Sequence, residues 1–213
     1  MTHPGNELEV YGKINYPILG RMLRYPATAL ASHWLFQGLL YMDKTERLFK
    51  LGLDAILTLT GYLVLQRWLS PAPLFGVTFF TAHTLNFLFN GQVWGVLKGY
   101  GMVEMERADF DTYTTGIVNR ARREPSIDKL LLYGSLARKQ WTVTSDFDAR
   151  IVRKTGHING LRACWFVLRE RSLALFKQFP IDIYVLDSVT FLDKMRNDEE
   201  PCDLLHIHRN VDF

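Results

Sequence analysis

Apolar positions in the C-terminal half form short continuous runs and one helical stripe. Residues 128–133, 146–153 and 181–187 are short runs rich in Leu, Ile and Val, which is typical of strands buried in a sheet. Residues 160–179 instead repeat apolar side chains at the spacing of an amphipathic helix. The order strand, turn with a short helix at 134–140, strand, helix and strand predicts a small α+β sheet domain with flanking helices.

Three carboxylates accompany the two later runs. Asp146 and Asp148 stand two positions apart, and successive strand residues point to opposite faces, so both side chains project from one face. Asp182 lies in the last run, between two isoleucines. Like charges held side by side repel each other and need a compensating cation. Because hard oxygen ligands select Mg²⁺ or Mn²⁺, the pattern predicts a divalent-metal site formed by these three aspartates.

Polar groups suited to phosphate lie close to the same runs. Gly134 and Ser135 form a turn before the short helix, where backbone N–H groups and a hydroxyl can face a phosphate. Arg138 follows that turn and is either a phosphate ligand or a solvated helix end. Arg150 follows Asp148 by two positions and shares its face, so we expect it to pair with a carboxylate or to contact a triphosphate.

Residues 105–190 resemble the minimal nucleotidyltransferase domain of the DNA polymerase β superfamily. The family pattern is an apolar residue before Gly-Gly or Gly-Ser, then Asp-x-Asp or Asp-x-Glu with x apolar, then an acid between apolar residues. Gly134-Ser135, Asp146 with Asp148, and Asp182 match these elements in order. The resemblance implies an NTP substrate such as ATP, Mg²⁺ or Mn²⁺ on the aspartates, and leaving-group phosphates at the Gly-Ser turn. Residues 141–144 depart from it, because many members carry a more polar, glycine-bearing loop there.

The N-terminal half contains three long stretches with few charges, at residues 25–42, 51–69 and 73–97. A helix needs about 20 apolar residues to cross the hydrocarbon core of a bilayer. In one interpretation the second and third stretches form a membrane hairpin that turns at residues 70–73, with the first lying along the surface. Such a hairpin either crosses the bilayer or enters it only part of the way. In the other they are buried helices of a soluble α-helical domain or an oligomer interface.

Four polar residues qualify the membrane interpretation. Asp54 stands within one turn of the start of the second stretch, where it can reach headgroups and water. His83, Asn86 and Asn90 lie three and four positions apart, so they form one polar stripe on a helix. We expect that stripe to join helix to helix by hydrogen bonds rather than to bind a ligand.

Charge divides the 213 residues into two parts. Residues 1–101 hold eight Lys/Arg and five Asp/Glu, whereas residues 102–213 hold 17 of each. Two glycines at positions 99 and 101 suit a boundary, so we predict an apolar helical, membrane-associated domain (1–101) and a nucleotidyltransferase domain (102–213). A helix over 104–123 would open the second domain. The two cysteines, Cys164 and Cys202, show no zinc-site spacing and indicate free thiols in a reducing compartment.

These features predict an enzyme that moves a nucleoside monophosphate from an NTP to a hydroxyl or phosphate acceptor. The N-terminal half places it at the cytoplasmic face of a membrane, with a homo-oligomer or a membrane enzyme as possible partner. One alternative is a catalytically silent subunit that binds nucleotide in a membrane complex and acts as a regulator or scaffold. Another is a soluble enzyme that modifies proteins or tRNA, although the chain has no extended basic and aromatic strip for nucleic acid.

Overall fold

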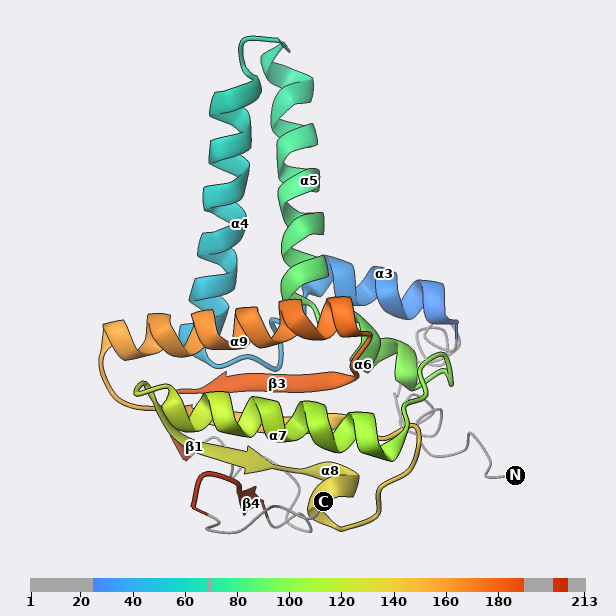
Figure 1. The fold of residues 1–213 in the computed structure, drawn as a ribbon. Helices are drawn as coiled ribbons and strands as arrows, with labels where there is room; N and C mark the ends of the chain where they lie inside the picture. Colours follow the sequence, from blue (N-terminus) through green and yellow to red (C-terminus); the bar gives the residue numbers. More distant parts are fainter. Residues whose placement is uncertain (1–24, 69, 190–200, 207–213) are drawn as a thin grey trace.

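The computed structural model describes residues 25–68, 70–189 and 201–206 (Figure 1). Its helices are α3 (Pro26–Phe36), α4 (Lys44–Leu65), α5 (Pro71–Asn90), α6 (Val93–Lys98), α7 (Arg107–Arg123), α8 (Gly134–Ala137) and α9 (His157–Lys177). Its strands are β1 (Ile127–Leu132), β2 (Phe147–Arg153), β3 (Ile181–Leu186) and β4 (Cys202–Asp203). The α+β class is confirmed, and the three predicted strands and the 160–179 helix begin and end within three residues of these bounds.

The strands form one mixed sheet in the order β3-β2-β1-β4. β1 pairs antiparallel with β2 and with β4, whereas β2 pairs parallel with β3. Parallel neighbours need a long crossover, and α9 supplies it between β2 and β3. The short strand β4 was not predicted, since two residues are too few to show an alternating pattern.

Alternation along the strands separates a fully apolar face of the sheet from a mixed one. The apolar face packs against α7 and α9 and forms the main core, which includes Phe110, Ile117, Leu130, Phe147, Ile151, Phe179, Ile183 and Val185. The other face carries a small buried cluster, Leu131, Tyr133 and Val152. Asp148 and Asp182 alternate with core residues and therefore belong to this second face.

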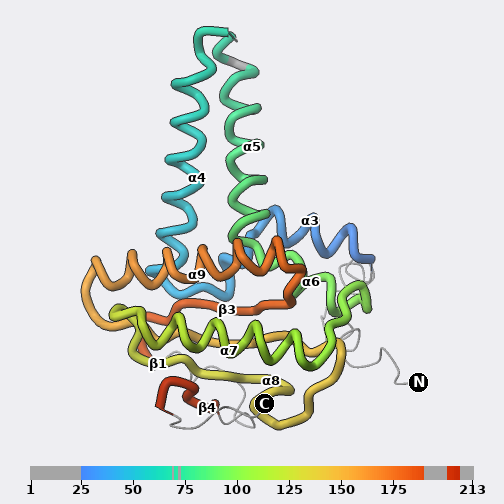
Figure 2. Tube along the Cα trace, viewed as in Figure 1, coloured from blue at the N-terminus to red at the C-terminus, as the bar shows by residue number. Residues whose placement is uncertain are grey.

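Helices α4 and α5 form an antiparallel hairpin that projects well beyond the sheet and its helices (Figures 1 and 2). Their 22 and 20 residues correspond to roughly 33 and 30 Å of helix. The side chains that α4 buries are all polar and recur every four residues: Glu46, Lys50, Asp54 and Thr58. Large apolar side chains of both helices are exposed instead: Leu48, Leu51, Ile56, Leu59, Leu63, Val64, Phe75, Val77, Phe79, Phe80, Leu85 and Leu88.

The predicted polar stripe of α5 does join the two helices. Asn86 donates to Asp54 Oδ1 at 2.9 Å, and His83 Nδ1 lies 2.8 Å from Asp54 Oδ2. The expectation that the Asp54 side chain is open to water is wrong, because it is 9% exposed and bonds to two residues of α5. Helix α4 begins seven residues earlier than the apolar stretch, at Lys44 after the cap Asp43, so Asp54 lies in its third turn and faces α5.

A glycine ends α5 and divides the third apolar stretch into two helices. A Cβ on Gly91 would lie 2.1 Å from the Phe87 carbonyl oxygen, so no other residue fits there without a shift of the backbone. Gln92 then adopts a left-handed conformation and leads into α6. The break turns α6 onto the sheet, where a Cβ on Gly95 would lie 2.7 Å from the Ile181 carbonyl oxygen.

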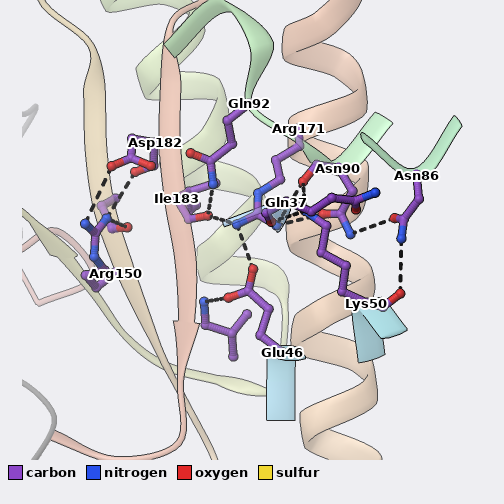
Figure 3. A network of polar contacts seen from close by, with 12 residues as sticks. Gln37, Glu46, Lys50, Asn86, Asn90, Gln92, Arg150, Arg171, Asp182 and Ile183 are labelled. Carbon is purple, nitrogen blue, oxygen red and sulfur yellow. Dashed lines mark hydrogen bonds and ion pairs between the residues drawn. The ribbon is translucent and has the colours of Figure 1, made fainter. Parts of the chain in front are cut away.

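The root of the hairpin closes the free edge of β3 (Figure 3). The Ile183 carbonyl accepts from Arg171 of α9 and, at 3.1 Å, from Gln92 Nε2. The Val185 N–H donates to Glu46 Oε2 at 2.6 Å. Glu46 Oε1 and Arg171 Nη2 are 2.7 Å apart, and both side chains are at most 2% exposed. An edge strand that would otherwise present unpaired backbone groups is thus covered by charged side chains.

This buried pair yields a stability prediction. The Arg171→Met variant keeps side-chain volume but leaves Glu46 buried without its cation, which costs about 3–5 kcal/mol in the free energy of unfolding. Arg169→Met, two residues away on α9, removes a guanidinium that is 52% exposed and should cost under about 1 kcal/mol. Chemical unfolding of the two variants measures the difference, and equal losses would contradict the role given to Arg171.

Candidate functional site

Adjacent parallel strands bring two of the predicted aspartates together. Asp148 of β2 and Asp182 of β3 are register partners. Arg150 contacts both carboxylates, with Nη1 2.7 Å from Asp148 Oδ1 and Nη2 3.6 Å from Asp182 Oδ2. Figure 3 shows Arg150 beside Asp182. The prediction that Arg150 pairs with a carboxylate is confirmed, and it pairs with two.

The guanidinium of Arg150 makes cation–π contacts with two tyrosine rings. Its Cζ lies 4.8 Å from the ring centroid of Tyr184 and 6.0 Å from that of Tyr133. Burial alone would lower the pKa of Arg150, but Asp182 and Asp148 raise it by more, so the group stays charged. Arg171 also approaches Tyr184, at 5.1 Å, so one ring contacts both the carboxylate pair and the hairpin root.

The third aspartate is paired with a lysine from the N-terminal half. Asp146 Oδ1 lies 2.7 Å from Lys98 Nζ, at the end of α6, and both side chains are less than one-fifth exposed. Sequence reasoning missed Lys98 as a site residue. The available signal was its isolation, since it is the one charged residue between Arg67 and Glu104.

The Gly-Ser turn lies against this group of carboxylates. Gly134 has a φ of 69°, a left-handed conformation that favours glycine, and a Cβ there would lie 3.6 Å from Asp148 Oδ2. The preceding Tyr133 N–H donates to the Asp148 carbonyl at 2.9 Å. Ser135 Oγ is 2.9 Å from Ser145 Oγ, and Ser145 directly precedes Asp146. The turn therefore lies against Asp148 and is joined through Ser145 to the segment that carries Asp146; Gly134, Ser135 and the three aspartates are called the constellation below.

Two other predicted features lie at its margin. Arg138 ends α8 and donates to Gln140 at 3.4 Å on the surface. In the loop that departs from the family pattern, Trp141 packs on the main core, with its ring 6.3 Å from Phe110 and 5.0 Å from the Arg107 guanidinium. An aromatic side chain therefore anchors this loop to the core.

The N-terminal helices also approach the site from α3. Burial lowers the pKa of His33 on α3, and the negative charge of Asp182 acts in the opposite direction. A Cβ on Gly38, whose φ is 72°, would lie 3.4 Å from the Tyr184 hydroxyl. Residues of α6 and of the loop after α3 therefore lie against residues of the site, and the division at residue 101 stays a prediction.

Three carboxylates and two cations leave this constellation acidic. In the part of the chain that the structure describes, no three His, Cys, Asp or Glu side chains gather as metal ligands. The aspartates supply the hard oxygens that Mg²⁺ and Mn²⁺ prefer, but Arg150 contacts two of them and Lys98 the third. A divalent ion would have to compete with these side chains for the same oxygens.

Compared with known proteins, the chain matches no family model, no curated protein and no solved structure. The α+β class and the arrangement of the carboxylates therefore stand on the structure itself. The nucleotidyltransferase resemblance, the divalent metal and the NTP remain predictions of the sequence.

Competition between Arg150 and a divalent ion can be measured by thermal unfolding. In Arg150→Met, Asp148 and Asp182 face each other without their shared cation, and we expect a lower melting temperature, by roughly 2–4 °C for each kcal/mol lost. Mg²⁺ or Mn²⁺ should restore it by binding the carboxylates. Lys154→Met changes an exposed cation directly after β2. It should keep the wild-type melting temperature both with and without Mg²⁺ or Mn²⁺. A variant indifferent to Mg²⁺ at constant ionic strength would show that these carboxylates hold no divalent ion.

Proposed function

We propose that this protein transfers a nucleoside monophosphate from an NTP to a hydroxyl or phosphate acceptor, with pyrophosphate as the other product. The observation that carries the proposal is the register pairing of Asp148 with Asp182, beside a Gly-Ser turn that lies against Asp148. Asp146 adds a third carboxylate through the loop that Ser145 ties to the same turn. These groups stand along the chain in the order that the sequence resemblance implies.

The aspartates would hold Mg²⁺ or Mn²⁺, which neutralises charge on the phosphates and favours attack at the α-phosphorus. Asp182 would accept the proton that a hydroxyl acceptor loses as its oxygen bonds to phosphorus and the bond to pyrophosphate breaks. Gly134 and Ser135 would contact the leaving phosphates. Arg150 and Lys98, released from their carboxylates by the bound cation, would supply positive charge to the same phosphates.

A second candidate is a catalytically silent subunit that binds nucleotide. It is favoured by the present pairing, in which side-chain cations already satisfy all three aspartates. In such a protein Arg150 and Lys98 would remain in place when nucleotide binds, and no metal-dependent turnover would follow.

The hairpin supports a location at a membrane. Among the described residues, α4 is the one helix whose length and apolar composition suffice to cross a bilayer. It buries polar side chains against α5 and exposes apolar ones, the reverse of a hairpin made for water. Lys44, Arg47 and Lys98 lie on the root side and Arg67 at the tip, so the basic residues favour a cytoplasmic sheet domain. A second copy or a membrane enzyme covering the same apolar face is the competing arrangement.

Transfer from α-labelled ATP, GTP, CTP and UTP tests the enzyme directly. With Mg²⁺ or Mn²⁺ and a membrane-containing extract, we expect the wild type to place label in protein, RNA or lipid. Asp146→Asn/Asp148→Asn should lose several kcal/mol of charge stabilisation, roughly a 100-fold fall in rate. Asp128→Asn, which changes an exposed aspartate on β1, should keep the wild-type rate.

Absence of transfer with all four nucleotides would contradict the proposed nucleotidyltransferase activity. If that protein is folded and still binds NTP, the silent nucleotide-binding subunit explains the site instead. Equal loss of transfer in Asp128→Asn and in the double variant would show that the assay reports folding rather than the proposed site.

A further inference from the structure

We propose that the α4–α5 hairpin enters a single leaflet of the bilayer and ends near the midplane, without crossing it. This inference rests on the membrane location proposed above and does not depend on the catalytic activity. The exposed apolar face of α4 and α5 would therefore contact the acyl chains of the leaflet nearest the sheet domain.

The segregation of side chains in the hairpin identifies lipid as what covers it. The seam between the helices holds Asp54 and Thr58 of α4 and Thr78 and Asn86 of α5, all less than one-tenth exposed. Outward-facing residues of both helices are instead apolar and half or more exposed, among them Ile56, Leu59, Leu63, Phe75, Val77 and Phe80. An exposed apolar surface of this extent on both helices is what a membrane requires, because lipid cannot satisfy polar groups on the outside.

The root of the hairpin is fixed outside the bilayer. Glu46 binds the backbone of β3, and Lys50 Nζ donates to the carbonyls of Gln37 and Asn90 at 2.9 and 2.7 Å (Figure 3). On α9, which lies crosswise at the root, the charged side chains of Arg162 and Arg169 are about half exposed. A helix with such charges stays in water or among headgroups.

The length that remains beyond the root is too short to cross. Beyond Lys50, 15 residues lead to the end of α4 at Leu65, or roughly 22 Å, and α5 runs a similar distance back to Asn86. A bilayer is about 40–45 Å thick with its headgroups, and its hydrocarbon core alone is about 30 Å. Starting at the headgroup surface, the tip therefore stops about halfway through.

The charges at the two ends favour the same depth. The tip brings one charged side chain, Arg67, into the bilayer interior. A full crossing would free Arg67 but would draw the root inward, with Arg162, Arg169 and the edge of β3. Asp54 and His83, paired about one turn above the root, then lie at the headgroup level. Burying Arg67 alone near the midplane costs less free energy than drawing Arg162 and Arg169 into the bilayer.

Depth-dependent fluorescence quenching tests the depth of the hairpin tip in the bilayer. The result does not depend on which side of the vesicle the sheet domain faces. A bimane fluorophore is attached to Ser70→Cys at the tip, in a Cys202→Ser background and in vesicles of phosphatidylcholine and phosphatidylglycerol. Cys164 stays unlabelled because burial raises its pKa to about 12 and removes access. The matched control is Val143→Cys on the sheet domain, where the side chain is 50% exposed.

The inference predicts that nitroxide near the end of the acyl chain quenches the tip fluorophore more than nitroxide on the headgroup. The Val143→Cys control should respond only to aqueous iodide. Stronger headgroup quenching at the tip would place the tip at a bilayer surface, either across the membrane or on the near side, and would overturn the inference alone. Quenching of the tip by iodide only, or shielding from every quencher by a second copy, would overturn both the inference and the membrane location. Nucleotidyl transfer is measured separately and is untouched by either result.

Discussion

The buried ion pair between Glu46 and Arg171 is the contact on which the remaining architecture depends. It joins α4 to α9 at the outer edge of β3, and each partner also bonds that strand's backbone. Two charges removed from water are costly, and each hydrogen bond that they make offsets part of that cost. Here Asn90 Oδ1 accepts from Arg171 at 2.7 Å, so α5 takes part as well. The hairpin, the edge strand and the crossover helix are consequently held as one unit.

That unit reaches the carboxylates through β3. Asp182 precedes Ile183, whose carbonyl Arg171 holds, and Tyr184 contacts Arg171 on one side and Arg150 on the other. The carboxylate group therefore shares a strand and an aromatic ring with the root of the hairpin. A membrane that fixes the hairpin would also fix the orientation of this face toward the bilayer surface.

Local patterns predicted much of the fold because they are set by neighbours in sequence. Apolar runs predicted β1 to β3, and helical spacing predicted α9. The expectation that neighbouring strands bring Asp182 beside Asp148 also agrees with the register of β2 and β3. Contacts between distant segments have no such signal. Lys98 pairs with Asp146 because α6 packs near the sheet, and Arg150 contacts Asp182 as well as Asp148 because β3 lies next to β2. The burial of Asp54 was missed because α4 extends through charged residues that pattern reading assigns to water.

Amide hydrogen exchange at Val185 tests most directly whether the hairpin root closes the edge of the sheet. In the wild type this N–H donates to Glu46 Oε2 and should exchange slowly. In Glu46→Ala it should exchange far faster, while amides in the β1–β2 ladder keep their protection. Exchange at Val185 that is as slow in the variant as in the wild type would contradict the coupling of hairpin, edge strand and carboxylate face.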